Sequence, residues 1–335
     1  MTPSSHKEQA PFQVHSWQRD ERNPVLPPGP SAFDVECCMN PFAIRRGEEY
    51  YLFYAGGDGN GKRRICLAIA PVGDLSAWKR LGPVLEVGGE GSFDASWCVL
   101  PCVHRIGNRW HLYYTGRHVA LGGGLQSFTG IGLAVSNDLL HWSRLSPEPV
   151  LRGDGFAEWP DNRGIAGGGR IIELAQEDGR TLYRKFYTLA TGTPSPDLLV
   201  DQRKYAVSAD SYDGVEWFNK QVVLRPRPEA DYENAATIAL NLWKTATGWR
   251  AIYAGIGSRF GAYSICEAES CDGRHWHRGA PGENLALPPQ GAGWESRMTE
   301  YPNVIEENGR LRLFYCGNGY GRTGIGTAIA DKLSF

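Results

Sequence analysis

HSWQRDERNPVLPPG, residues 15–29, joins a tryptophan and a basic residue to a Pro-Val-Leu run that enters a turn. The same order of residues occurs inside the chain in AWKRLGPVLEVG, residues 77–88, where it ends a repeated unit. A strand typical of the end of a repeat therefore stands near the start of this chain, and the rest of the repeat explains why.

The repeat is built on an aromatic-rich, β-prone run that ends at or beside a glycine, as expected of a strand that enters a turn. Its copies are YYLFYAGG (50–57), WHLYYTGR (110–117), KFYTLATG (185–192), WRAIYAGIG (249–257) and LRLFYCGNG (311–319). A strand of small residues follows each copy, and four copies then run through a turn to a tryptophan: Trp78, Trp142, Trp217 and Trp276. Asp-Gly at 213–214 and 272–273 is a strong hairpin signal in two of these turns.

The last copy reaches DKLSF at residues 331–335 without a tryptophan and a fourth strand, and residues 15–29 supply both. An N-terminal strand that completes the last blade leaves no open sheet edge. The sequence therefore predicts an all-β fold: a five-bladed β-propeller with four antiparallel strands per blade, in which the N-terminal strand completes the last blade.

The repeat also sets the predicted boundaries within a single domain, residues 1–335. Residues 1–30 form the N-terminal arm and closing strand. The blades then cover residues of about 31–90, 91–153, 154–228, 229–290 and 291–335.

Composition narrows the range of partners and compartments. The net charge of −2 gives no reason to expect nucleic acid or an anionic membrane surface as a partner. The sequence has no apolar run long enough for a membrane span and no signal sequence, so we expect a cytoplasmic protein. The eight cysteines are expected to be free thiols, with no metal and no cofactor.

Carboxylates recur before the innermost strand of every predicted blade. Pro41, Pro101 and Pro302 each stand thirteen residues before a repeat tyrosine, and Gly168 and Leu240 are the matching positions of the other two blades. Seven residues earlier the sequence has Asp34, Asp94, Asp161, Glu233 and Glu295. Two interpretations are open: the acids cap the same turn in every blade, or they line the mouth of the ring as acid–base groups.

Departures from the repeat indicate a binding pocket. If these segments are extended, alternate positions share a face, which would place Glu36, Arg163 and Arg297 below the rim. The same alternation predicts Asn40 and Tyr301 on a floor that also contains Cys38 and Cys98. Glu300 falls outside this alternation and occurs in one blade only, so it is a further candidate for a catalytic carboxylate.

Aromatic residues cluster in the same segments. Trp97 and Trp159 are not repeated, and aromatic faces of this kind can stack on sugar rings as well as pack between blades. The glycine-rich stretch 116–130 is predicted to cover the mouth, and His118 within it is a further binding candidate.

Three segments carry a resemblance to a known family: FDVECCMNPFAI (33–44), SICEAESCDGRHW (264–276) and WESRMTEYPNVIEENGRLRLFYCGNGYGRTGIGTAIA (294–330). They resemble the five-bladed propeller glycoside hydrolases, the group that holds families 43, 32, 68 and 130, in an uncharacterised bacterial branch. The resemblance implies an aspartate nucleophile or base in blade 1, an aspartate in blade 2 and a glutamate acid in blade 3. The matching blade 1 and blade 2 positions here are Asn40 and Leu100.

The first functional hypothesis is a glycoside hydrolase-like enzyme that acts on a glycosidic or sugar-like substrate by carboxylate acid–base chemistry. Asp94 and Asp161 would form the acid–base pair with help from Glu233. The other candidate catalytic carboxylates are Asp34, Glu36 and Glu300. Arg163 and Arg297 would bind a carboxylate, phosphate or hydroxyl group. Two alternatives remain open: an enzyme that cyclises, isomerises or alkylates a non-sugar metabolite, and a non-catalytic binding propeller.

Overall fold

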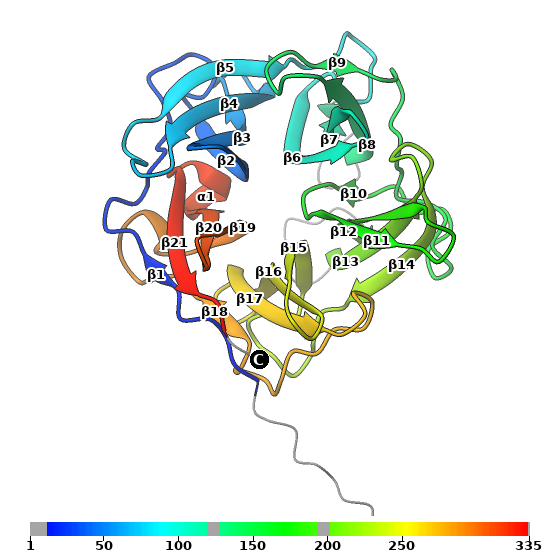
Figure 1. Ribbon diagram of the computed structural model, residues 1–335. Helices are drawn as coiled ribbons and strands as arrows, with labels where there is room; N and C mark the ends of the chain where they lie inside the picture. The colour runs from blue at the N-terminus through cyan, green and yellow to red at the C-terminus, as the bar shows by residue number, and fades with distance from the viewer. Residues whose placement is uncertain (1–11, 120–127, 193–201, 334–335) are drawn as a thin grey trace, which may run out of the picture.

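The computed structural model describes residues 12–119, 128–192 and 202–333. These residues are nearly all β, and their sheets stand around a common centre (Figure 1). Helix is almost absent from the described part, where it is represented by α1 (Asn318–Gly321) and a 3-10 turn at Gly293–Glu295. The prediction of an all-β chain is confirmed, and the sheets are arranged as in a β-propeller. No helix in the described ranges is both long and apolar enough to cross a membrane.

The strands pair with their neighbours in the chain, antiparallel and in consecutive groups. The first two groups are β2 (Cys37–Arg46), β3 (Glu49–Gly57), β4 (Arg63–Pro71) and β5 (Lys79–Leu85), then β6 (Trp97–Ile106), β7 (Arg109–Arg117), β8 (Phe128–Ser136) and β9 (Ser143–Arg144). In the next group β10 (Ile165–Ala166) and β11 (Ile171–Ala175) both pair with β12 (Thr181–Gly192), followed by β13 (Gln202–Ser211) and β14 (Phe218–Leu224).

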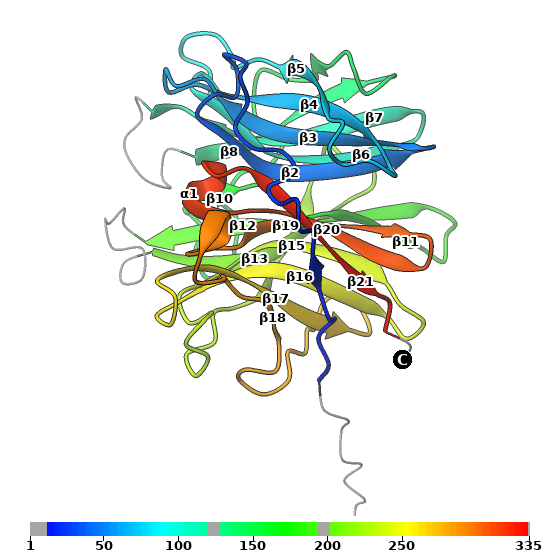
Figure 2. The ribbon, with the colours of Figure 1, turned by 90° about the vertical axis from the view of Figure 1, so that its left-hand side faces the viewer.

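The remaining groups bring the two ends of the chain together. They are β15 (Ala236–Lys244), β16 (Trp249–Gly257), β17 (Ala262–Ser270) and β18 (Leu285–Leu287), then β19 (Glu300–Glu307), β20 (Arg310–Cys316), β21 (Ile325–Asp331) and β1 (Gln18–Arg19). Gln18 pairs with Ile329 and Arg19 with Ala328, and a further bridge joins Leu26 to Ile325. Strand β1 therefore lies beside β21 as the fourth strand of the last group (Figures 1 and 2).

The repeat tryptophans join neighbouring groups. Each packs edge-on against an aromatic residue of the preceding group. In the sequence, that aromatic residue stands immediately before the repeat tyrosine of its group. The pairs are Trp142 with Phe53, Trp217 with Tyr113, Trp276 with Phe186 and Trp78 with Phe314, at centroid distances of 5.8, 5.8, 6.2 and 6.3 Å. Such edge-to-face pairs add to the apolar burial between sheets, and they explain why a tryptophan recurs at one place in the repeat.

Candidate active site at the centre of the ring

Four of the five recurrent acids are buried between a tyrosine and an arginine. Asp94 is typical: its Oδ2 accepts a hydrogen bond from the Tyr114 hydroxyl at 2.9 Å and lies 2.8 Å from Nη2 of Arg144. The equivalent sets are Asp34 with Tyr54 and Arg80, Glu233 with Tyr253 and Arg278, and Glu295 with Tyr315 and Arg19. The four carboxylate side chains are at most 4 % exposed, and the partners given above are side chains of later strands rather than the backbone N–H groups of a capped turn.

The third group lacks this arrangement. Asp161 is exposed, and the hydroxyl of Tyr187 is buried without a hydrogen-bond partner. Asn219 stands two residues after Trp217, where the other groups have arginine, and it donates to Asp210 at 2.7 Å. Asp94 and Asp161, predicted as an acid–base pair, are thus placed in opposite environments, one buried and one exposed.

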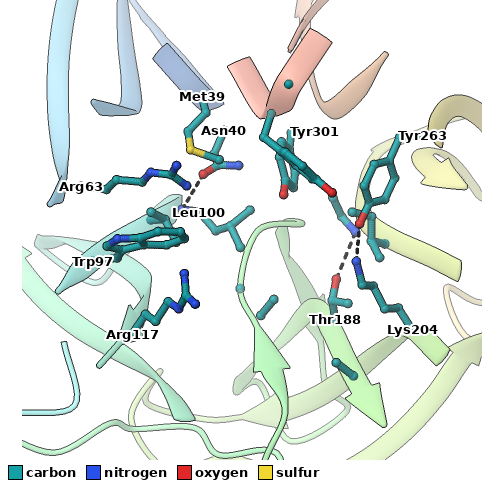
Figure 3. Close-up of a pocket in the computed structure, with 18 of the residues that line it drawn as sticks. Met39, Asn40, Arg63, Trp97, Leu100, Arg117, Thr188, Lys204, Tyr263 and Tyr301 are labelled. Atoms are coloured by element: carbon teal, nitrogen blue, oxygen red, sulfur yellow. Dashed lines mark hydrogen bonds between the residues drawn. The ribbon is translucent and has the colours of Figure 1, made fainter. Parts of the chain in front are cut away.

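A cavity of about 510 Å³ opens at the centre of the ring (Figure 3). Its walls come from the innermost strands and from the ends of the strands beside them. The described residues that line it are Met39, Asn40, Arg63, Trp97, Val99, Leu100, Arg117, Ala166, Gly167, Thr188, Ala190, Lys204, Ile238, Ala239, Tyr263, Tyr301, Gly319, Tyr320 and Arg322. They include four cationic side chains and no carboxylate, so this cavity suits an anionic ligand.

A backbone irregularity decides which side chains reach the cavity. Asn40, Leu100, Ala239 and Tyr301 have φ of 56°, 57°, 55° and 52°, in the left-handed region that non-glycine residues rarely adopt. The strand register shifts at each of these residues, which is the mark of a β-bulge. Left-handed residues at a binding site store strain that the surrounding fold must hold.

The bulge corrects the predicted alternation. Two successive residues, such as Met39 and Asn40 or Val99 and Leu100, both line the cavity. Cys38 and Cys98, predicted for the floor, are instead fully buried and do not line it. The prediction of a thiol-containing floor was wrong because it assumed an unbroken extended strand.

One wall of the cavity is cationic and aromatic. The guanidinium groups of Arg63 and Arg117 stack on the Trp97 ring, with their carbons 3.8 and 4.1 Å from its centroid. Burial and the nearby charge of Arg63 lower the pKa of Arg117. Glu36 lies at the edge of this wall, 2.8 Å from Arg322 and 3.7 Å from Arg63.

Lys204 and three tyrosines form the opposite wall (Figure 3). The ammonium group of Lys204 donates to the Tyr263 hydroxyl at 2.5 Å. Glu300 lies behind this wall with 0 % exposure, and its carboxyl group interacts with the side chain of Tyr301 as well as with Lys204. Burial raises the pKa of Glu300 to about 8 and lowers that of Lys204 to about 8, while the attraction between the two charges opposes both shifts.

The other candidates of the sequence lie apart from the cavity. Trp159 stacks on Tyr205 with 4.7 Å between centroids, and Arg163 and Arg297 are exposed. His118 is half-buried and is not among the lining residues. Residues 120–127 of the stretch predicted to cover the mouth lie outside the described residues. The substrate-binding candidates that line the cavity are thus Asn40, Trp97 and Tyr301.

Sequence reasoning missed Arg63, Lys204 and Tyr263, which occupy one repeated position. Each lies three residues before the residue paired with its repeat tyrosine: Cys66 with Tyr54, Val207 with Tyr187, and Cys266 with Tyr253. All three side chains line the cavity. A comparison of the starts of the third strands, rather than only of the first strands, would have found them.

Comparisons with known proteins agree with this fold. No family model matches the chain. A protein of Mycobacterium tuberculosis strain H37Rv, described as uncharacterized protein Rv1502, is 28 % identical over 292 residues, which cover 85 % of this chain and 89 % of that protein.

Solved structures are similar over nearly the whole chain. A putative glycoside hydrolase from Parabacteroides distasonis superposes with a TM-score of 0.69 at 16 % identity, covering 96 % of this chain and 98 % of that one. A structure described for glycoside hydrolases of the GH130 family that target β-1,2-mannosidic linkages gives 0.67 at 16 % identity, with 95 % and 94 % covered. The chain therefore has the fold of the propeller-type glycoside hydrolases.

Proposed function

We propose that this protein is an enzyme of the five-bladed propeller type that acts on a small, anionic, sugar-like substrate in the central cavity. The observation that carries the proposal is the charge of the lining: Arg63, Arg117, Arg322 and Lys204, with no carboxylate among the described lining residues. Arginine binds carboxylate and phosphate groups through paired N–H donors. Glu36 offsets part of this charge from the edge of the cavity, where it lies 2.8 Å from Arg322 and 3.7 Å from Arg63, and an anionic group of the substrate would be attracted by the remainder.

The remaining lining supports a sugar-like substrate of limited size. Asn40 lines the cavity, and its amide nitrogen Nδ2 is buried without a hydrogen-bond partner. A buried donor of this kind costs free energy unless a ligand accepts its hydrogen bond. A hydroxyl or ring oxygen of the substrate would do so.

Glu300 and Glu36 are the acids we propose for the chemistry. Burial raises the pKa of Glu300 to about 8, and because its side chain does not line the cavity it would exchange a proton with the substrate through Tyr301, which does. Glu36, between Arg322 and Arg63, would be the second carboxyl group of the pair. Asp34, Asp94, Asp161 and Glu233 were predicted as catalytic from the sequence, and their catalytic role stays a prediction that nothing in the cavity supports.

A second candidate function is based on the apolar floor of the cavity. Met39, Val99, Leu100 and Ile238 make it apolar, which suits a non-sugar metabolite that carries one anionic group. The two candidates share the arginine wall and differ in the body of the ligand.

Calorimetric binding of matched ligands separates these outcomes. Glucuronate and glucose 6-phosphate should bind, and glucose should not. Arg322→Gln should weaken the anionic ligands by about tenfold or more, since a charged hydrogen bond contributes roughly 1.5–3 kcal/mol. Arg163→Gln, which changes an exposed arginine outside the cavity, is the matched control.

Equal affinity for glucose and glucuronate would refute the proposal, and binding of benzoate but not glucuronate would favour the non-sugar candidate.

A further inference from the structure

Lys204 is placed differently from the other buried lysine of the same group. Its side chain lines the central cavity, and the residue is 7 % exposed. Lys185, on the neighbouring strand β12, is fully buried, donates to the Gly168 carbonyl at 3.4 Å and does not line the cavity. A ligand in the cavity can therefore reach the Lys204 amine, whereas Lys185 is closed off.

The surroundings of Lys204 disfavour its charged form. Its nitrogen donates to the Tyr263 hydroxyl, and no carboxylate of the described residues lies within 4.0 Å to form a salt bridge with it. A lysine in a poorly solvated site loses its proton more readily and becomes a nucleophile. Burial accordingly lowers the pKa of Lys204 to about 8.

An acid stands close enough to interact with this amine. Glu300 immediately precedes the left-handed Tyr301, as Met39, Val99 and Ile238 precede the left-handed residues of their groups. Those three side chains line the cavity, whereas Glu300 is covered. Its carboxyl group interacts with Tyr301, which lines the cavity, and its charge attracts that of Lys204.

We propose that the neutral amine of Lys204 is a nucleophile that forms an imine with a small aldehyde or ketone carrying an anionic group. The arginines of the cavity, Arg63, Arg117 and Arg322, would bind the anionic group of this compound. The inference therefore rests on the proposed function in one respect, that the central cavity is the binding site. The open-chain form of an acidic sugar has both groups, as do 2-oxo acids.

The bond changes balance without an oxidant or a reductant. The nitrogen lone pair of Lys204 forms a bond to the carbonyl carbon, the π electrons of the carbonyl move to oxygen, and a proton passes from nitrogen to that oxygen. The resulting carbinolamine takes a proton from the Tyr301 hydroxyl, which lines the cavity and regains a proton from the carboxylic acid of Glu300, and it releases water. The products are a protonated imine, water and the carboxylate of Glu300.

Reductive trapping tests the inference on the full chain. The protein is incubated with glyoxylate and sodium cyanoborohydride, digested, and mapped by mass spectrometry. We expect the reduced adduct at Lys204 in preference to the exposed Lys62 and Lys244, and none at Lys185. Lys204→Met should abolish that adduct. Modification of exposed lysines at the same rate as Lys204, or no adduct at Lys204 in folded protein, would overturn the inference.

Acetaldehyde, a neutral aldehyde of similar size, separates this inference from the proposed function. Arg322→Gln should slow trapping of glyoxylate and leave that of acetaldehyde unchanged. Binding of glucuronate with no trapping at Lys204 would refute the imine alone. Trapping at Lys204 with no effect of Arg322→Gln on glyoxylate would support the nucleophile and refute the anionic preference. Because the wild-type peptide map compares lysines within one folded protein, it tests the imine even if Lys204→Met does not fold.

Discussion

Tyr114 and Asp94 stand twenty residues apart in the chain, and the hydroxyl of the first donates to the carboxylate of the second at 2.9 Å. Arg144, in the fourth strand β9, forms a salt bridge with the same carboxylate. The second and fourth strands of one group, β7 and β9, are thereby tied to the turn that leads into its first strand, β6. The recurrence of this set makes it part of the scaffold that supports the cavity.

Asp94→Asn should therefore act on stability. Removing one partner of a buried ion pair typically costs about 3–5 kcal/mol, because the remaining charge stays uncompensated. We expect a loss of roughly this size in the free energy of unfolding, measured with urea. Asp161→Asn, at an exposed carboxylate of the same repeat, is the control and should change little. An Asp94→Asn protein of unchanged stability that has lost turnover would restore the catalytic interpretation.

Closure of the ring gives a second prediction. Arg19 in β1 donates to Glu295 at 2.9 Å and also contacts the Pro288 carbonyl, so Arg19→Ala should loosen the closing strand. The pair is largely buried, and we expect a loss of about 2–3 kcal/mol in unfolding free energy. Arg22 pairs only with the nearby Asp20 and is exposed, so Arg22→Ala should cost less than about 1 kcal/mol. Similar losses in both variants would argue against anchoring by Arg19.

The left-handed residues give a third prediction. A non-glycine residue in this region costs roughly 1–2 kcal/mol, so Ala239→Gly should leave stability unchanged or raise it by up to about 1 kcal/mol despite the flexibility that glycine adds. Ala254→Gly, at a buried position of regular strand β16, should lower stability by about 1 kcal/mol. Thermal unfolding of the two variants measures the difference. A larger loss for Ala239→Gly than for Ala254→Gly would contradict the assignment of strain.

Glu300 gives a prediction for the dependence of stability on pH. Its pKa is raised from an ordinary 4.5 to about 8, so between these values the folded protein binds more protons than the unfolded chain, and stability falls as pH rises. The lowered pKa of Lys204 has the opposite sign, and its contribution makes stability rise with pH from about 8 toward 10.5. The facing hydroxyls of Tyr263, Tyr301 and Tyr320 have raised pKa values and stay protonated across the lower window.

Glu300→Gln should flatten the fall in unfolding free energy between about pH 5 and 8. Urea titrations at several pH values measure it, with Glu36→Gln as the control at a partly exposed acid. A slope that is unchanged in Glu300→Gln would mean that Glu300 ionises normally.

The repeat allowed much of the fold to be predicted. Its tryptophans and the match of residues 15–29 to residues 77–88 depend on local order, and the pairing of β1 with β21 agrees with that match. The wall of the cavity was harder to predict, because a left-handed residue such as Leu100 changes which side chains face inward. A leucine in the sequence does not indicate that its backbone is left-handed. Lys204 and Tyr263 were missed because strands far apart in the chain bring them together.

The order of synthesis gives the closing strand a further consequence. Strand β1 is made first and its partner β21 last, so the earliest segment must wait for nearly the entire chain before it can pair. Glu300, Tyr301, Tyr320 and Arg322, which complete the candidate site, belong to the same late group. During synthesis the candidate site is therefore expected to stay incomplete until β21 has left the ribosome and paired with β1.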